Sequence, residues 1–183
     1  MELPTLKLTT AMIPAAAVLA SLLVAAPAFA QNKETTGFQI AGDQPIDIDA
    51  DEFEVDDATK LITFSGNVVA VQGVNKVRSS KMTVRYEGGS TGIASGQGDI
   101  DRIDLYGGVR LDTDTQSATG DTGHFDIPTQ LFVLEGKEVV LQENGNVFVG
   151  CKLTVNMATS QAKLDACGKR VQVRLNPQSR PGN

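Results

Sequence analysis

The sequence predicts an all-β protein, a sandwich, jelly roll or open barrel of many short strands. Apolar and polar residues alternate with period two, as at residues 46–49 and 82–86, which places one row of side chains inward and the next outward. No segment of about 10 residues after residue 30 has helical periodicity. Turn residues recur at short intervals, which predicts strands of about five or six residues: Asp56-Asp57, Ser65-Gly66-Asn67, Gln72-Gly73, Gly88-Gly89, Gly107-Gly108 and Glu143-Asn144-Gly145-Asn146.

The first 30 residues have the features of a cleaved secretory signal. Lys7 precedes an apolar stretch at residues 11–26, and Ala28-Phe29-Ala30 offers small residues at the two positions that a signal peptidase reads. The alternative is a retained membrane anchor, but the apolar stretch is short for a bilayer span of about 20 residues, and prolines interrupt it. We therefore expect a signal at 1–30, one domain at 31–176 and a flexible tail at 177–183.

Composition argues against nucleic acid as a partner. Without Glu2 and Lys7 the remaining chain has 16 − 1 = 15 basic and 22 − 1 = 21 acidic residues, so its net charge stays at −6. A protein that binds nucleic acid is usually basic. An anionic ligand would therefore not be held mainly by long-range electrostatic attraction.

Few residues are suited to catalysis or metal binding. His124 is the only histidine and falls within an expected strand, so a catalytic triad or a zinc site has too few partners. The acidic run at 47–57 lacks the glycine of a calcium-binding loop, and reads as a strand with a solvated acidic face. The glycine-rich stretch at 88–98 has no P-loop lysine. We expect no enzyme activity, no metal and no cofactor.

Cys151 and Cys167 are the only cysteines, and an even number in an exported chain favours a disulfide. A hairpin that turns at residues 158–160 would place residues whose numbers sum to 318 opposite each other, and 151 + 167 = 318. The alternative is a pair of reduced thiols packed in the sheet.

Three segments of the chain resemble one another. Phe64-Ser65-Gly66-Asn67-Val68 is similar to Leu105-Tyr106-Gly107-Gly108-Val109, and to Leu134-Glu135-Gly136-Lys137-Glu138-Val139 with one extra residue. The spacing predicts recurring units of strand, glycine turn and strand, stacked one on another. A stack of strands leaves an unpaired edge at each end, and pairing of unlike edges would build a head-to-tail filament.

The opening of the chain resembles a known family. Asp43-Gln44-Pro45-Ile46-Asp47-Ile48, and then Phe64-Ser65-Gly66-Asn67-Val68-Val69-Ala70-Val71-Gln72-Gly73, resemble the LptA (OstA-like) family of periplasmic lipopolysaccharide-transport proteins. Residues 132–136 and 168–171 resemble its third unit and its C-terminal strand. The resemblance implies a V-shaped, open β-jelly roll with a lengthwise apolar groove for the acyl chains of lipopolysaccharide. It also implies head-to-tail self-association, and a bridge from an inner-membrane LptC-like partner to an outer-membrane LptD-like partner.

Candidate groove residues come from the alternation, and Ile46 and Ile48 also match isoleucines of the family's inner face. Tyr86 stands where the family can carry a basic residue, which argues against a cationic phosphate contact there. The alternative for each position is an ordinary closed core. The candidates are Ile46, Ile48, Phe53, Val55, Phe64, Val69, Val71, Met82, Val84, Tyr86, Phe125, Phe132, Leu134, Leu153 and Val155.

Two other functions remain open from the sequence. The first is an LptC-like adaptor whose N-terminal segment is kept as an anchor. The second is a structural β protein that polymerises and binds no lipid. The measured mass of the exported protein tests the first, and the effect of lipopolysaccharide on stability tests the second.

Overall fold

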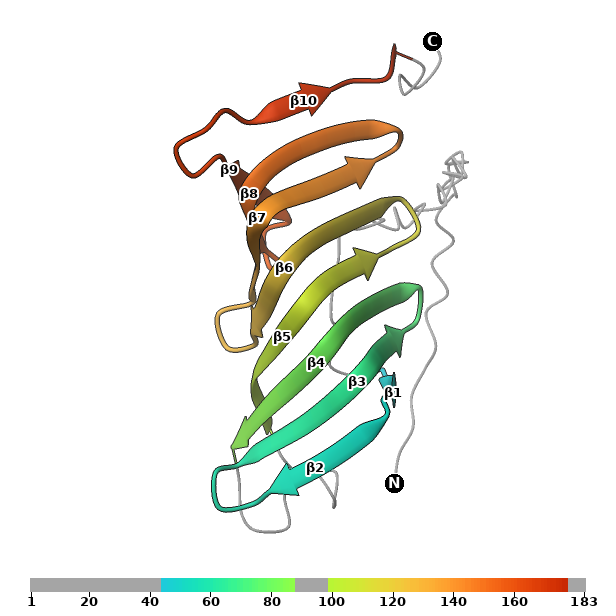
Figure 1. Ribbon diagram of the computed structural model, residues 1–183, viewed down its shortest axis with the longest axis vertical. Coiled ribbons are helices and arrows are strands. Elements are labelled where there is room, and N and C mark those ends of the chain that lie inside the picture. Colours follow the sequence, from blue (N-terminus) through green and yellow to red (C-terminus); the bar gives the residue numbers. More distant parts are fainter. Residues whose placement is uncertain (1–43, 88–98, 178–183) are drawn as a thin grey trace, which may run out of the picture. The chain divides into compact units, whose positions relative to one another are not determined.

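The computed structural model describes residues 44–87 and 99–177, and ten strands make up one sheet (Figure 1). The expected signal segment, the glycine-rich stretch at 88–98 and the tail from residue 178 lie outside the described residues. The strands are β1 (Asp47–Asp49), β2 (Glu52–Asp56), β3 (Leu61–Gln72), β4 (Asn75–Glu87), β5 (Asp99–Asp112), β6 (Gln116–Asp126), β7 (Leu131–Glu143), β8 (Asn146–Asn156), β9 (Gln161–Asp165) and β10 (Gln172–Arg174).

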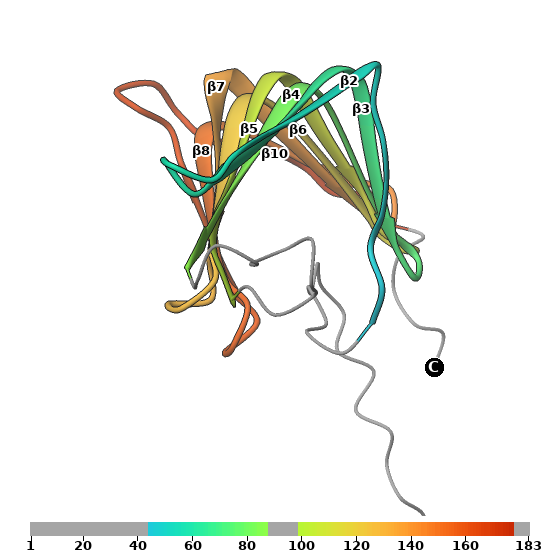
Figure 2. The same cartoon turned by 90° about the horizontal axis from the view of Figure 1, so that it is seen from below.

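The sheet is antiparallel throughout, with the order β1-β3-β4-β5-β6-β7-β8-β10. β2 also pairs with β3, and β9 also pairs with β8, so each edge of the sheet is formed by two short strands in succession. Viewed from below, the sheet curves into an arch that stays open on one side (Figure 2). The prediction of an all-β, open jelly roll is confirmed.

The long strands contain β-bulges where glycine turns were expected. β3 to β8 have 11 to 14 residues each, so the prediction of strands of five or six residues was wrong. The ladder shifts register at residues 65–68, 106–109 and 135–139, within the three similar segments. Gly66 and Gly107 have φ of 76° and 79°, a conformation that bends a strand without reversing it.

The three bulges occupy equivalent places in the sheet. Cross-strand pairs connect Phe64, Leu105 and Leu134, the first residues of the three segments, through Met82 and Gly123. Each bulge therefore bends the sheet along the same line, which accounts for its arched section.

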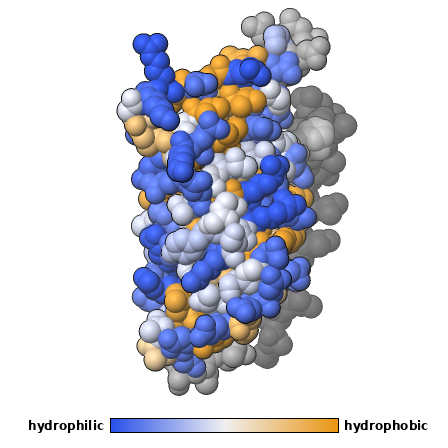
Figure 3. All heavy atoms as spheres, in the orientation of Figure 1, coloured by the Kyte–Doolittle hydropathy of each residue, from blue (hydrophilic) through white to orange (hydrophobic). Residues whose placement is uncertain are grey.

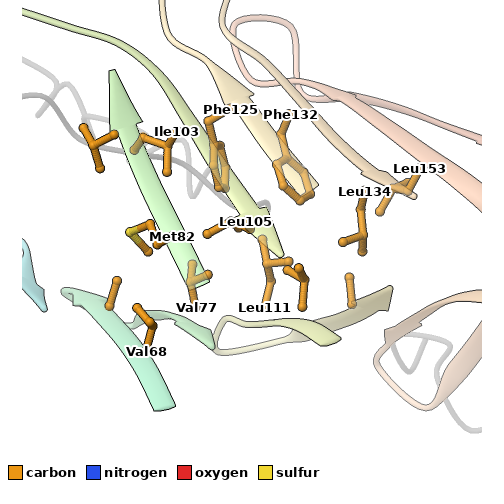
Figure 4. Packing of buried hydrophobic residues seen from close by; sticks show 14 of the residues in the cluster. Val68, Val77, Met82, Ile103, Leu105, Leu111, Phe125, Phe132, Leu134 and Leu153 are labelled. Carbon is orange, nitrogen blue, oxygen red and sulfur yellow. The ribbon is translucent and has the colours of Figure 1, made fainter. Parts of the chain in front are cut away.

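The core lies on the concave face. The curvature of the sheet brings apolar side chains of its concave face together, and Figure 4 shows these side chains converging between the strands. The rings of Phe125 and Phe132 stack with centroids 4.4 Å apart. Leu134 is fully buried, and it packs so closely on Gly120 that a Cβ there would come within 2.8 Å of its Cγ.

The disulfide between Cys151 and Cys167 is confirmed, with 6.0 Å between the Cα atoms. The predicted register was wrong by one residue, because Leu153 pairs with Leu164 and the numbers of paired residues sum to 317. A four-residue turn at 157–160 replaces the expected three-residue turn. Cys167 consequently lies beyond β9, with φ of 46°, and the bond ties β8 to the link between β9 and β10.

Candidate binding trough

Three rows of apolar side chains cross the concave face from one edge of the sheet to the other. Directly paired residues of neighbouring strands share a face of the sheet, so each row follows from the register. We call this surface the trough. Its first row is Val55, Ile62, Val84, Ile103, Phe125, Phe132, Val155 and Ala162; the second is Phe53, Phe64, Met82, Leu105, Gly123, Leu134, Leu153 and Leu164; the third is Ile48, Ala70, Val77, Leu111, Ala118, Leu141, Phe148 and Val173.

Two hollows lie along the trough. The N-terminal hollow, of about 70 Å³, is bordered by apolar side chains of β1 and β3 to β6, among them Ile48, Val77 and Met82. The C-terminal hollow, of about 310 Å³, lies over β5 to β9 and is bordered by Leu141 and Val155 among others. Both hollows therefore border residues of the rows.

Burial changes along the rows. Phe132 and Leu134, in the middle of the sheet, are 2% and 0% exposed. At the edges, Phe53 is 63% exposed and Val173 is 53% exposed, although both belong to the same rows. The middle of the trough is thus packed against itself, whereas its two ends present uncovered apolar side chains, which is a recognised mark of a contact surface.

Polar groups border the trough. Gln116 donates a hydrogen bond to Glu143, with 2.5 Å between Nε2 and Oε1, and both residues border the C-terminal hollow. Near the opposite ends of the strands, the Tyr86 hydroxyl donates to Asp57 at 2.5 Å. That hydrogen bond is the main cause of a raised pKa for Tyr86, which keeps the phenol neutral. The trough therefore combines an apolar floor with polar borders.

The convex face has a different character. Figure 3 shows it covered largely by hydrophilic side chains, with apolar side chains in smaller areas. Arg78 and Arg110 both contact Asp112, at 2.5 and 2.7 Å. Burial alone would raise the pKa of Asp112, but hydrogen bonds and charge from the two arginines outweigh it and lower that pKa. Glu135 and Lys152 form another convex pair at 2.7 Å.

Most of the groove candidates lie in the trough. Ile46 borders the N-terminal hollow, and Tyr86 is buried at the end of β4. Eleven others stand in the rows: Ile48, Phe53, Val55, Phe64, Met82, Val84, Phe125, Phe132, Leu134, Leu153 and Val155.

Val69 and Val71 take the convex face. Val69 pairs with Asp49 and Arg78, and Val71 pairs with Asp47 and Lys76. Val71 also borders the N-terminal hollow, but its charged cross-strand partners belong to the convex face. The alternation of β3 continues in phase through the bulge, so the even-numbered residues remain inside.

The alternation also indicates trough residues that were not among the candidates. Ile103 and Leu105 alternate with Arg102 and Asp104, which is a strict period-two pattern. Ala70 follows from continuing the phase of β3. The other row residues with an apolar side chain that were missed are Ile62, Val77, Leu111, Ala118, Leu141, Phe148, Ala162, Leu164 and Val173.

The trough offers little reactive chemistry. Within residues 44–87 and 99–177, no three His, Cys, Asp or Glu side chains are placed to hold a metal ion. His124 pairs with Asp104 and Val133 on the convex face. Burial first, and then the charge of Arg102, lower the pKa of His124. The trough itself, an apolar surface, can hold an apolar chain by excluding water.

A membrane-spanning helix is not found in the described part of the chain, where no helix is long and apolar enough to cross a bilayer.

Comparisons with known proteins agree on one family. A family model described as "LptA/(LptD N-terminal domain) LPS transport protein" matches residues 47–161. The lipopolysaccharide export system protein LptA of Escherichia coli (strain K12) is 33% identical over 170 residues, which cover 87% of this chain and 83% of that protein. An uncharacterized protein of Rhizobium meliloti (strain 1021) is 46% identical over 171 residues, 92% of each chain.

A solved structure supports the fold. The crystal structure of LptH from Pseudomonas aeruginosa is described as the LptA homologous periplasmic component of the conserved lipopolysaccharide transport device. It matches with a TM-score of 0.61 over 73% of this chain and 96% of that chain, at 20% identity, which bears on the fold alone. From the matching family model and the similarity to LptA, the chain belongs to the LptA/(LptD N-terminal domain) family of lipopolysaccharide transport proteins.

Proposed function

We propose that this protein is a periplasmic carrier that holds the acyl chains of lipopolysaccharide in the trough while they cross an aqueous space. One observation carries the proposal: three rows without any charged or polar side chain run from the first edge of the sheet to the last. A closed globular core would bury its apolar residues at the edges as well. Here the rows end in uncovered side chains such as Phe53 and Val173.

The free energy of transfer supports this function. Exposing an acyl chain to water costs roughly 25 cal/mol per Å² of apolar surface, or about 0.8 kcal/mol per CH₂ group. A trough that covers one side of the chain removes part of that cost along the whole path. Because the trough stays open, the lipid remains free to move on.

The net charge of the protein is consistent with a carrier that binds the acyl chains of lipopolysaccharide more than its anionic headgroup. The net charge of −6 does not attract an anionic glycolipid, and the rows contain no charged side chain. The polar borders, with Gln116 and Glu143 on one side and Tyr86 and Asp57 on the other, leave the sugar portion in water.

The same edges make the protein part of a longer path. We infer that copies stack head to tail, so that the rows of one copy continue into the rows of the next. The ends of such a stack would meet an LptC-like partner at the inner membrane and an LptD-like partner at the outer membrane. Among the described residues, β1–β2 and β9–β10 form the two outer edges of the sheet, and this supports the inference because an outer edge can accept one more strand.

The test compares intact lipopolysaccharide with the same polysaccharide after removal of its acyl chains. Thermal unfolding of the protein lacking residues 1–30 is followed at increasing concentrations of each. We expect intact lipopolysaccharide to raise Tm and the deacylated form to leave it unchanged. Equal effects of the two forms, or no effect of either on folded protein, would contradict the proposal and favour a structural role without lipid.

A further inference from the structure

The two edges of the sheet carry opposite charge. Residues 46–57, at the N-terminal edge, contain seven acidic residues and no basic one. Residues 161–175, at the C-terminal edge, contain four basic residues and one acidic residue, a net charge of 4 − 1 = +3. The basic residues are Lys163, Lys169, Arg170 and Arg174.

Strand direction makes the two edges compatible. Seven antiparallel pairings lead from β1 to β10, so β10 runs opposite to β1. If the C-terminal edge of one copy is placed against the N-terminal edge of another, β10 meets β1 and β9 meets β2 in antiparallel orientation. The junction then continues the pattern of the sheet.

The register predicts which side chains face each other at such a junction. One convex row begins at Asp47, passes through Val71 and Lys76, and ends through Val147 at Arg174. Another begins at Glu54 and ends through Thr154 at Lys163. Both rows therefore have an acid at the N-terminal edge and a base at the C-terminal edge.

We propose that two cross-strand ion pairs select the head-to-tail docking of a second copy of this chain, Arg174 with Asp47 and Lys163 with Glu54 of the next copy. The proposal rests on the stacking described under the proposed function. In the same register Val173 of one copy lies beside Ile48 of the next, so the third row of the trough continues across the junction.

The groups are available for these contacts. Asp47, Glu54 and Arg174 are exposed, and no ion pair within the described part of the chain engages them. Lys163 is 75% exposed at the side chain and lies 2.8 Å from Asp165, so its amine can be shared with a second carboxylate.

Charge also disfavours the other arrangements. Two N-terminal edges would bring seven acidic residues against seven, and two C-terminal edges would bring like positive charges together. Like charges directly opposite in a sheet are destabilising. The edges are exposed, so the selection weakens with salt.

The experiment is a charge swap, read out by sedimentation of the protein lacking residues 1–30. We expect Arg174→Glu alone and Asp47→Arg alone to weaken self-association by about tenfold. Combining both changes in one chain restores association, and so does mixing the two single variants. The matched control is Arg170→Glu, which makes the same charge change at the same end but outside the paired strands, and it leaves association within about twofold.

Two results would overturn the proposal. The first is a loss of association by Arg170→Glu equal to that by Arg174→Glu, which would assign the effect to net charge. The second is the absence of rescue in the double variant. A failure of the proposed function is distinguishable from these results. An unaltered chain that never self-associates refutes the stacking. Lipid binding is read separately, by repeating the Tm test with lipopolysaccharide at a protein concentration where only single copies are present.

Discussion

Two Phe→Ala variants, one in the middle of the trough and one at its edge, test whether the middle is packed while the edge is open. Phe132 and Phe53 both belong to the apolar rows, and both are changed to alanine. Phe132 is 2% exposed and stacks on Phe125, whereas Phe53 is 63% exposed on the edge strand β2. The chemical change is the same, so a difference in cost reports the difference in environment.

The expected magnitudes follow from the areas. Burying a whole phenylalanine removes about 200 Å² from water, which at about 25 cal/mol per Å² is worth about 5 kcal/mol. Phe132→Ala should therefore lower the free energy of unfolding by about 4 kcal/mol, within the usual range for buried phenylalanine. Phe53 has about a third of its surface covered, so Phe53→Ala should cost about 1.5 kcal/mol.

The assay is urea denaturation at concentrations where light scattering shows single copies. At higher concentration, Phe53→Ala should weaken self-association because the second row then lacks its first side chain. If the two variants lose equal free energy as single copies, β2 is not an open edge and the reasoning fails.

Three further predictions concern the faces, the disulfide and the histidine. Ala70→Asp puts a charge in the third row, so it should lower the free energy of unfolding by several kcal/mol and abolish the effect of lipopolysaccharide on Tm. Val69→Asp puts the same charge on the convex face, so it should lower that free energy by about 1 kcal/mol and retain the effect. Equal losses in the two variants would refute the assignment of the faces. Changing Cys151 and Cys167 together to serine should lower the free energy of unfolding by about 3 kcal/mol and accelerate hydrogen exchange at β10 far more than at β5. Equal acceleration at both strands would contradict a disulfide that stabilises the C-terminal edge locally. Folding lowers the pKa of His124, so the unfolded chain takes up a proton first as the pH falls. The free energy of unfolding should therefore fall as the pH drops below about 6.5. A His124→Gln variant whose free energy of unfolding has the same slope against pH would refute this.

The architecture was largely readable from the sequence because a half-buried antiparallel sheet imposes a period of two on the chain. Ile48, Met82 and Val84 alternate with charged or hydroxyl residues, and each lies in the trough. The three similar segments also marked equivalent places in the sheet. Gly66 and Gly107 were misread as chain reversals, since a left-handed glycine serves a bulge as well as a turn.

Face and register were the hardest to predict. Whether Gly66 and Asn67 shift the phase of β3 decides whether Val69 or Ala70 points inward, and the sequence alone does not report the phase across a bulge. The same ambiguity of one residue affected the hairpin at 157–160 and displaced the expected partner of Cys151. The disulfide still forms, because the link after β9 brings Cys167 back to β8.

The most direct test of the trough is photo-crosslinking to lipopolysaccharide from neighbouring positions on opposite faces of one strand. A photoreactive residue is placed at Leu141, which borders the C-terminal hollow, and separately at Val140, which pairs with Thr119 and Val149 on the convex face. Ile48 and Asp47 form a second pair of positions on β1. The account predicts lipid adducts from Leu141 and Ile48, and none from Val140 and Asp47. Adducts from both faces in equal yield, or none from Leu141 and Ile48 in folded protein, would contradict the claim that the concave rows hold the acyl chains.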